Sequence, residues 1–446
     1  MTSKNPLDWE YHQVDHLFLL IGENPLPNYV AAKTLLTEGG KPYFVYTEHT
    51  QKAVERLQEV LEVPEEQRQK LTVALENYES NAHEIRQRIH NKITEIREEE
   101  SKQQEPKLRF GLNYTGGTKA MAVHSYQAFL ELKDLEPVVF SYLDSRTMQM
   151  MFDNPIPPVS VKNKASISLK QLFQLHGLSL SKDPKSEVVY PELVSVLIKT
   201  ENLKAWKSWC RKVLQVQGKV QTEIATIKDG NDKEVKIVHL SNWKKKNELK
   251  SMFLDIKELP EEIKNILINY GITEDINKLS INKLIDQQTI PKPSDNAKYP
   301  EEICKWLEGI WLEDFVLQTI KQIQQEDESI IDEFGMSFNF PPKANIAEFE
   351  FDVAFLRGYQ LFALSCTTDD TPGLCKLKLF EAYRRAKQMG GDEARVALVC
   401  CSNNPSKIRN DFLAKIKDEK VKVFGSKDLP ELGQKLQTWI KEVEKL

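Results

Sequence analysis

The stretch that decides the fold is Asp15-His16-Leu17-Phe18-Leu19-Leu20-Ile21, whose apolar core runs unbroken and stops at Gly22. A run that does not alternate with polar residues is typical of a strand buried on both faces of a parallel sheet. A polar turn from Gly22 to Asn28 follows it, and a helical pattern with Tyr29 and Leu35 comes next. The first elements are therefore expected to be a buried strand, a turn and a helix.

The same order of elements recurs over the first third of the chain. Further strands are expected at residues 42–46, 108–113 and 138–143, with a long charged helical stretch at about 51–103 and a helix at 120–132. Strands that alternate with helices indicate an α/β fold with a mostly parallel, doubly wound sheet. In such sheets ligands bind beyond the carboxyl ends of the strands.

Length and composition exclude several classes of protein. The 446 residues exceed one ordinary domain, and 61 basic against 66 acidic side chains give a formal charge of −5, so a nucleic-acid partner would need a local basic patch. No apolar run approaches the roughly 18 residues of a membrane span, and the polar start of the chain lacks the apolar core of a signal peptide. We therefore expect a cytoplasmic protein without a membrane partner.

The six cysteines fit a reducing compartment. They form no Cys-x-x-Cys pair and stand at no zinc-finger spacing from a histidine, so they are expected to be free and buried. They are Cys210, Cys304, Cys366, Cys375, Cys400 and Cys401.

Prolines divide the chain into three parts. They cluster at 153–158 and again at 290–295, which predicts domains at 1–157 and 296–446 and a mainly helical connecting region at 158–295. The connecting region is rich in Lys and Glu, has a hairpin signal around 229–231, and carries a basic run at 243–246 that is expected to be a solvated face. The last part reads as a second α/β unit. Its helices are expected at 306–323 and 374–389, and its strands at 350–356, 360–366 and 395–401.

Three polar turns follow strands of the first unit. The most informative is Asn113-Tyr114-Thr115-Gly116-Gly117-Thr118-Lys119, where two glycines let backbone amides approach a phosphate at a helix N-terminus. The spacing is not that of a Walker loop. The other two turns are 22–28 and 47–50, and together the three predict a phosphate-binding shelf at one edge of the sheet. Its candidate ligand-binding residues are Gly22, Asn24, Pro25, Thr47, Thr50, Thr115, Gly116, Gly117, Thr118 and Lys119.

The segments Leu-Leu-Ile-Gly-Glu-Asn-Pro-Leu-Pro-Asn-Tyr (19–29) and Asn-Tyr-Thr-Gly-Gly-Thr-Lys-Ala-Met (113–121) resemble the CARF domain of type III CRISPR ancillary effectors. More narrowly, the chain is similar to those effectors that join a Rossmann-like CARF domain to a PD-(D/E)xK nuclease domain. The resemblance implies a homodimer that binds a cyclic oligoadenylate, most often cyclic tetra-adenylate, across its twofold axis. A ligand with repeated phosphates suits a shelf that symmetry duplicates.

Acidic residues of the last part predict a metal site. Glu350 and Asp352 lie two apart on one expected strand, hence on one face, and Glu313 joins them if its helix packs over the sheet. Such carboxylates hold Mg²⁺ or Mn²⁺ beside a scissile phosphate in metal-dependent nucleases, although acidic residues are more often simple surface charges. The order Trp-Leu-Glu, Glu-x-Asp and a return strand resembles the PD-(D/E)xK core, and this resemblance implies a DNA or RNA nuclease.

The return strand departs from that family. Where a Glu-x-Lys is expected, the chain reads Ser365-Cys366-Thr367, and none of these replaces a carboxylate or an ammonium. Either the catalytic lysine has moved to the following helix, or the site is inactive. On that helix Lys378 and Glu381 share a face and are preferred over Lys376. Further along it, Arg384, Arg385 and Lys387 are candidates for contacts with a nucleic-acid backbone.

The sequence thus predicts a cyclic-oligoadenylate-activated, metal-dependent nuclease of antiviral defence. One alternative is a cyclic-oligoadenylate sensor whose degenerate nuclease fold only binds nucleic acid or a protein. Another is a restriction-type nuclease that ignores nucleotides.

Overall fold

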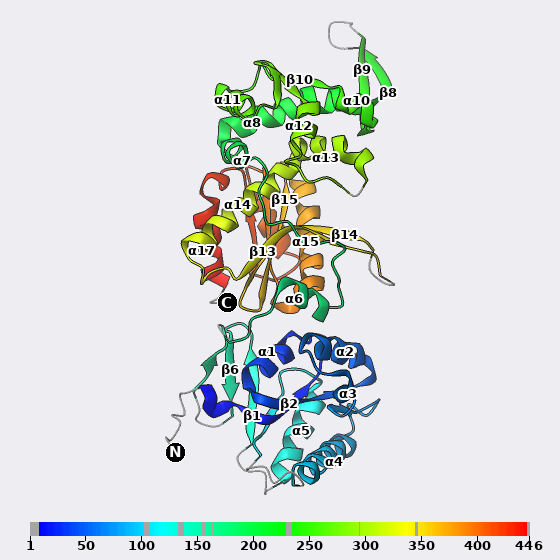
Figure 1. Ribbon diagram of the computed structural model, residues 1–446, viewed down its shortest axis with the longest axis vertical. Coiled ribbons are helices and arrows are strands. Elements are labelled where there is room, and N and C mark those ends of the chain that lie inside the picture. The colour runs from blue at the N-terminus through cyan, green and yellow to red at the C-terminus, as the bar shows by residue number, and fades with distance from the viewer. Residues whose placement is uncertain are drawn as a thin grey trace.

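The computed structural model describes residues 9–101, 108–132, 138–153, 157–162, 164–228, 234–293, 295–343 and 347–443. Parts of both predicted linkers, residues 154–156 and 294, and the predicted hairpin turn at 229–231 lie outside these residues. Figure 1 shows the N-terminal sheet at one end of an elongated molecule and the C-terminal sheet in its middle. The helices and small sheets of residues 191–290 stack beyond the C-terminal sheet, not between the two units.

The N-terminal unit is built on a seven-stranded sheet in the order β3-β2-β1-β4-β5-β6-β7. The first five strands in this order are parallel and the last two are antiparallel, which confirms the predicted mostly parallel, Rossmann-like sheet. The strands are β1 (Val14–Leu20), β2 (Leu36–Tyr46), β3 (Thr72–Ala74), β4 (Phe110–Asn113), β5 (Val139–Asp144), β6 (Gln149–Phe152) and β7 (Val159–Ser160).

Three details of this sheet differ from the expectation. The single charged helix expected over 51–103 is interrupted by the short strand β3, and β6 and β7 extend the sheet past 143. The strand expected at 42–46 begins earlier, because β2 starts at Leu36 and passes through Gly39 at a φ of +80°. These short or glycine-containing strands carry too few apolar residues to give a strand pattern.

Helices cover both faces of the N-terminal sheet. In the long helix α4, Ile85, Ile89, Ile93 and Ile96 recur every three or four residues and are all buried, so a mostly charged sequence still packs on one side. The helices of this unit are α1 (Leu26–Leu35), α2 (Gln51–Val60), α3 (Glu65–Arg68), α4 (Ala82–Ser101) and α5 (Lys119–Glu131).

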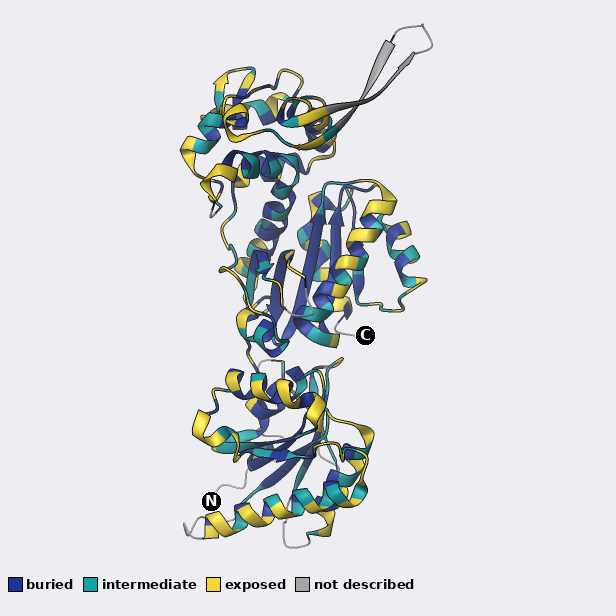
Figure 2. Ribbon diagram, turned by 90° about the vertical axis from the view of Figure 1, so that its right-hand side faces the viewer, coloured by how far each residue is buried: buried dark blue, intermediate teal, exposed yellow. Residues whose placement is uncertain are grey.

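The C-terminal unit has a five-stranded sheet in the order β13-β14-β15-β16-β17. The first two pairings are antiparallel and the last two are parallel, so the carboxyl ends of β15, β16 and β17 meet at one edge. Figure 2 shows that this sheet is buried along most of its length. The strands are β13 (Glu333–Phe340), β14 (Phe349–Arg357), β15 (Gln360–Thr367), β16 (Arg395–Cys400) and β17 (Val421–Phe424).

Alternation along β15 explains the two layers of helices. Phe362 and Leu364 belong to one buried core, whereas Leu361 and Ala363 belong to the other. The first core contains α14 (Trp311–Glu326) and α17 (Leu432–Val443), and the second contains α15 (Pro372–Gly390) and α16 (Pro405–Leu413). The predicted strands and helices of this unit are confirmed, while β13, which follows a polar segment, was not anticipated.

The connecting region is mainly helical, with a hairpin and a small three-stranded sheet of β10, β12 and β11. Buried Trp206 anchors the region, because its indole Nε1 donates a hydrogen bond to the Leu307 carbonyl oxygen at 3.1 Å. Its helical elements are α7 (Pro191–Leu197), α8 (Thr200–Trp209), the π-helical turn η3 (Cys210–Leu214), α9 (Gln215–Gly218), α10 (Lys246–Lys250), α11 (Glu261–Asn269) and α12 (Ile281–Gln287). Its strands are β8 (Lys219–Lys228), β9 (Glu234–Trp243), β10 (Phe253–Asp255), β11 (Thr273–Asp275) and β12 (Lys278–Ser280). From here α13 (Tyr299–Lys305) and a second π-helical turn, η5 (Trp306–Ile310), lead into α14.

The short helix α6 (Leu169–Leu175) joins the two sheet units. Its Phe173 ring packs edge-on against Phe338 and Phe340 of β13, and its backbone amide at Leu169 donates to Glu333. From the other side, the Arg56 guanidinium donates a 2.8 Å hydrogen bond to the carbonyl oxygen at the end of α6. The two units therefore share one continuous apolar core through α6.

The cysteines are all free and buried, as the sequence predicts. Among the described residues, no helix is both long and apolar enough to cross a membrane.

Candidate functional site

The two glycine-containing turns of the N-terminal unit meet where the strand order reverses. β1 and β4 are adjacent, and the turns that follow them touch, because a Cβ at Gly22 would lie 3.2 Å from the Gly117 nitrogen. This is the topological switch point at which doubly wound sheets bind ligands. We call the turns 22–28, 47–50 and 113–119 the ligand shelf.

Gly116 allows this close approach of the two turns. A Cβ at Gly116 would lie only 2.2 Å from the Leu20 carbonyl oxygen, a backbone atom that has no rotamer to change. Gly117 has a φ of +73°, in the left-handed region that side chains disfavour. Both glycines are therefore required by the backbone of the shelf itself.

Several predicted ligand-binding side chains are used to build the turns. The Thr115 hydroxyl donates to Asn113 Oδ1 at 2.8 Å and accepts from the Leu143 amide at 2.7 Å. The Thr118 hydroxyl caps α5 by accepting from the Met121 amide. Asn24 Oδ1 accepts from the Leu26 amide, one residue after Pro25. What the shelf offers to a ligand is accordingly backbone N–H groups together with the exposed Lys119 at the start of α5.

The third turn, 47–50, is held by hydrogen bonds between its own residues. Thr47 and Thr50 are both buried, and the Thr47 amide donates to the Thr50 hydroxyl at 3.1 Å. These two threonines fix the start of α2 after β2, and their hydroxyls contact each other at 3.4 Å.

Sequence reasoning missed two features of the shelf. Asn28 is fully buried beside Gly116, and its amide nitrogen donates to the Leu20 carbonyl oxygen. Its Oδ1 has no hydrogen-bond partner among the residues that the structure describes. Tyr114 and Tyr142 place their ring centroids 5.7 Å apart at the ends of β4 and β5. Two Asn-Tyr dipeptides, at 28–29 and 113–114, are visible in the sequence. The sequence does not show which of their polar atoms remain without a hydrogen bond.

In the C-terminal unit, Glu350 and Asp352 lie on β14, and α14, which carries Glu313, packs against β13 and β14. We call Glu313, Glu350 and Asp352 the carboxylate cluster. Asp352 is hydrogen-bonded to Ser365, near the carboxyl end of β15 and hence at the expected edge for a ligand.

Each of the three carboxyl groups has a raised pKa. Burial of the carboxyl group is the main cause in each case, although the Glu350 residue as a whole is exposed. The charge of Asp352 raises the pKa of both Glu313 and Glu350. The neighbouring Asp314 also has a raised pKa. Its pKa is about 6 because of burial, although Trp306 and the Val189 amide donate hydrogen bonds to it. The cluster thus concentrates negative charge that its surroundings compensate only in part.

The Ser365-Cys366-Thr367 segment positions Asp352. The Ser365 hydroxyl donates to Asp352 Oδ2 at 2.8 Å, and the Cys366 amide donates to the same oxygen at 2.6 Å. Both bonds go to Oδ2, so Asp352 Oδ1 receives neither of them. The residues that depart from the family pattern therefore orient the carboxylate instead of supplying the missing charges.

The structure separates the two candidate lysines of α15. The charge of Lys378 lowers the pKa of Asp352, while that of Glu381 raises it, so both lie near the cluster. Lys376 instead forms an ion pair with Asp411 of α16, at 3.1 Å. The structure thus brings Lys378 and Glu381, but not Lys376, toward Asp352.

Two lysines from a distant segment also reach the cluster. The charge of Lys185 lowers the pKa of Glu313 and Glu350, and that of Lys182 lowers the pKa of Glu350. Their segment lies along β13, where Lys185 and Met336 exchange backbone hydrogen bonds of 2.9 and 2.8 Å. More than 120 residues separate these lysines from Glu313, so no spacing in the sequence connects them.

The donor set fits a hard divalent cation. Carboxylate oxygens are the ligands that Mg²⁺ and Mn²⁺ prefer, and a cation would offset the charge that raises these pKa values. Among the described residues, however, no group of three or more His, Cys, Asp or Glu side chains has an arrangement that could hold a metal ion. The carboxylate cluster by itself is thus an incomplete ligand set.

The predicted basic face of α15 is largely engaged. Arg385 is buried with its guanidinium 4.2 Å from the Phe349 ring centroid, and Lys387 lies 3.6 Å from Asp418. Only Arg384 of the three is exposed.

Comparisons with known proteins place the N-terminal unit. Residues 17–170 match the sequence model of the Card1 CARF domain. The whole chain has the fold of protein VC1899 from Vibrio cholerae, at 16% identity and a TM-score of 0.64, over 96% of this chain and 98% of that one. It also has the fold of Can2 from Sulfobacillus thermosulfidooxidans in complex with cyclic tetra-adenylate, at 15% identity and a TM-score of 0.60, over 96% of this chain and 99% of that one. No curated protein sequence matches the chain. All three turns of the ligand shelf therefore lie within residues 17–170, the part of the chain that matches the Card1 CARF domain model.

Proposed function

We propose that the protein is a cyclic-oligoadenylate-activated, metal-dependent nuclease of type III CRISPR defence. The observation that carries this proposal is the presence, in one chain, of a CARF domain and of a carboxylate cluster at the carboxyl edge of a second α/β sheet. We assign residues 1–157 to the ligand-binding domain, 158–295 to the connecting region and 296–446 to a nuclease domain of the PD-(D/E)xK type.

The ligand shelf supports binding of a phosphate-rich ring. Backbone N–H groups at the start of a helix attract anions, and the exposed Lys119 adds a full positive charge at the same place. The Can2 structure that shares this fold holds cyclic tetra-adenylate, which makes this ring the first activator to test.

A homodimer would complete the site. Two apolar side chains seven residues apart on α5, Val123 and Leu130, are 53% and 57% exposed. They lie about one turn and about three turns beyond the shelf. A second copy packed on this helix would cover them and place two shelves around one ring.

The carboxylate cluster supports hydrolysis of a phosphodiester. A divalent cation bound there would polarise the phosphate and lower the pKa of the attacking water. The residues of this chain hold the site in place: Ser365 and the Cys366 amide orient Asp352, and the positive charge of Lys378 lowers the pKa of the same carboxyl. Because the three carboxylates are an incomplete ligand set, the substrate phosphate would supply further oxygen ligands.

The contact between the two units supports coupling of ligand to cleavage. A Cβ at Gly391, which follows α15, would lie 2.9 Å from Asn24 Nδ2 and 2.9 Å from the His176 ring. The ligand shelf therefore abuts the C-terminal end of the helix that carries Lys378 and Glu381. Activation requires that the ring bind the active arrangement more tightly than the resting one.

The direct test uses purified protein with Mn²⁺ and either plasmid DNA, single-stranded DNA or RNA, with and without cyclic tetra-adenylate. We expect cleavage of at least one substrate only when both metal and ring are present. Tight ring binding without any cleavage would favour the alternative function, a sensor with a degenerate nuclease fold. Cleavage that does not depend on the ring would favour a nucleotide-independent nuclease.

Substitution of Lys378 by Ala is expected to slow ring-activated cleavage by about 10²-fold, the lower range for loss of a positioned proton donor or acceptor. The matched control is Lys376→Ala on the same helix, which removes only the ion pair with Asp411. Initial rates at saturating ring concentration distinguish the two. Equal rates for both variants would exclude Lys378 from catalysis.

A further inference from the structure

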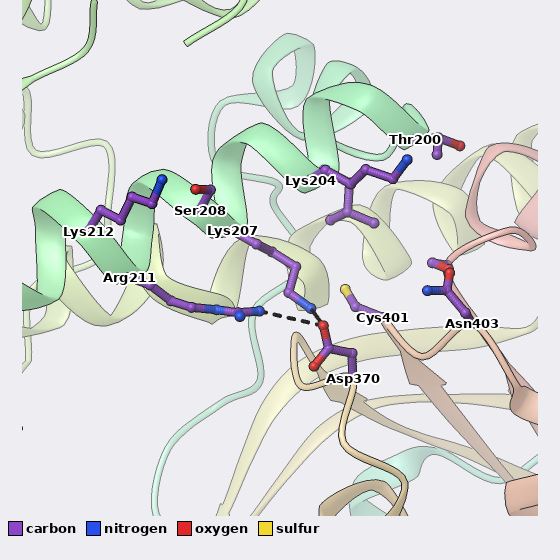
Figure 3. Close-up of a pocket in the computed structure, with 11 residues that line it drawn as sticks. Thr200, Lys204, Lys207, Ser208, Arg211, Lys212, Asp370, Cys401 and Asn403 are labelled. Carbon is purple, nitrogen blue, oxygen red and sulfur yellow. Dashed lines mark hydrogen bonds and ion pairs between the residues drawn. The ribbon is translucent and has the colours of Figure 1, made fainter. Parts of the chain in front are cut away.

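A cavity of about 370 Å³ lies between the connecting region and the C-terminal sheet. Four cationic side chains line it, Lys204, Lys207, Arg211 and Lys212, against the single carboxylate of Asp370. All four cations come from α8 and η3, while Asp370, Cys401 and Ser426 follow β15, β16 and β17 (Figure 3). We call this cavity the basic pocket. It is a local positive site on a chain whose formal charge is −5.

The acidic residue does not neutralise the basic pocket. Figure 3 shows Lys207 and Arg211 both reaching Asp370, at 2.6 and 3.5 Å. Lys212 is exposed and forms no ion pair seen among the described residues, and Lys204 pairs with an exposed glutamate on its own helix, Glu201. Net positive charge therefore remains on a hollowed, solvent-accessible surface, which is suited to a phosphate backbone.

The basic pocket adjoins the carboxylate cluster. The loop from Thr368 to Thr371 links the end of β15, where Cys366 binds Asp352, to the pocket residue Asp370. On the other side, α8 is fastened to η5, directly before Glu313, by the bond from Trp206 to Leu307 and by the contact of Cys210 Sγ with the same carbonyl at 3.4 Å. The loop after β15 and the junction of α8 with η5 thus hold both the cations of the basic pocket and the carboxylates in position.

We propose that the basic pocket binds the sugar-phosphate backbone of the nucleic-acid substrate and aligns the strand with the carboxylate cluster. This inference rests on the proposed nuclease function and deepens it. Phosphate contacts position a strand without reading its sequence, so Lys204, Arg211 and Lys212 serve as positioning residues. Lys207 keeps Asp370 in place and holds the loop after β15 against α8.

The test is the salt dependence of binding by the full chain, measured by fluorescence anisotropy with EDTA and cyclic tetra-adenylate present. The probes are a labelled single-stranded DNA, its duplex and the corresponding RNA. For the double variant Arg211→Gln/Lys212→Gln, we expect about tenfold weaker binding at low salt. The slope of log K against log salt should be shallower by about 1.4 on a single strand and about 1.8 on a duplex, because two phosphate contacts are lost. The probe that the wild-type protein binds most tightly at a given salt concentration identifies the preferred backbone.

The matched control is Lys417→Gln/Lys441→Gln, which removes two exposed cations of the C-terminal unit that do not line the pocket. It should bind with an unchanged slope. Lys212→Gln alone, which breaks no ion pair seen among the described residues, should lower the slope by about half as much. An unchanged slope in both pocket variants would overturn this inference while leaving the nuclease function intact. A wild-type protein that neither binds nor cleaves any probe would overturn both.

Discussion

Replacement of Asp352 by Asn is expected to reduce ring-activated cleavage by about 10³-fold, because a lost metal ligand removes about 4 kcal/mol of transition-state stabilisation. The amide oxygen of Asn can still accept the bonds from Ser365 and the Cys366 amide, so the fold should be preserved. Burial and like charges raise the pKa of this carboxyl, so loss of its charge should leave the melting temperature of the metal-free protein unchanged or higher.

Two further measurements separate catalysis from stability. Mn²⁺ should raise the melting temperature of the wild type, more strongly as pH increases, because protons compete with the metal for carboxylates of raised pKa. This stabilisation should vanish in Asp352→Asn and persist in Asp286→Asn, which changes an exposed carboxylate of α12. Cleavage by Asp352→Asn at the wild-type rate would remove the carboxylate cluster from the mechanism.

The second large effect is expected for Gly116→Ala, which should weaken the affinity for cyclic tetra-adenylate by about 10²-fold. The added methyl group would lie 2.2 Å from the Leu20 carbonyl oxygen, so the turn must move. Displacements of this kind cost about 1–3 kcal/mol, and a tenfold loss of affinity corresponds to about 1.4 kcal/mol. Isothermal titration calorimetry measures the loss directly, and cleavage should fall in parallel at a limiting concentration of the ring.

Gly373→Ala is the matched control for this substitution. No atom of the described part of the chain lies within 4 Å of a Cβ at Gly373, in the first turn of α15, so Gly373→Ala should leave ring affinity unchanged. If Gly116→Ala lowers the melting temperature of the whole protein, Lys119→Ala tests the same shelf by charge alone, with an expected tenfold loss that grows smaller at high salt. Wild-type affinity in both shelf variants would contradict the placement of the ring.

The sequence was most informative where pattern and local chemistry agree. The run before Gly22 and the paired glycines at 116–117 predicted both the parallel sheet and the edge at which its turns meet. Glu350 and Asp352 were placed on one strand by their spacing alone. In each of these cases the pattern that gives the prediction lies within one short segment, so local periodicity was sufficient.

Tertiary structure decided the rest. Neither Lys182 nor Lys185 could be connected with Glu350, because their segment reaches it only by lying along β13. Ser365 and Cys366 looked like the loss of two catalytic groups, whereas the structure shows them binding Asp352. The hydroxyls of Thr115 and Thr118 looked available for a ligand but are engaged in the turns themselves. Such roles depend on which polar atoms are already paired, and a linear sequence does not show this.

The position of α6 between the two sheet units limits how the domains of this protein can be exchanged. Phe173 packs against aromatic rings of β13, and Arg56 donates a hydrogen bond to the end of the same helix. The N-terminal and C-terminal units therefore cannot be exchanged by cutting the chain at a proline-rich linker. A chimera that exchanges the sensing half must import α6 with matching partners on both sides. Exchange of the halves as independent modules would expose the apolar residues that are buried around α6, and aggregation would be the first observable result.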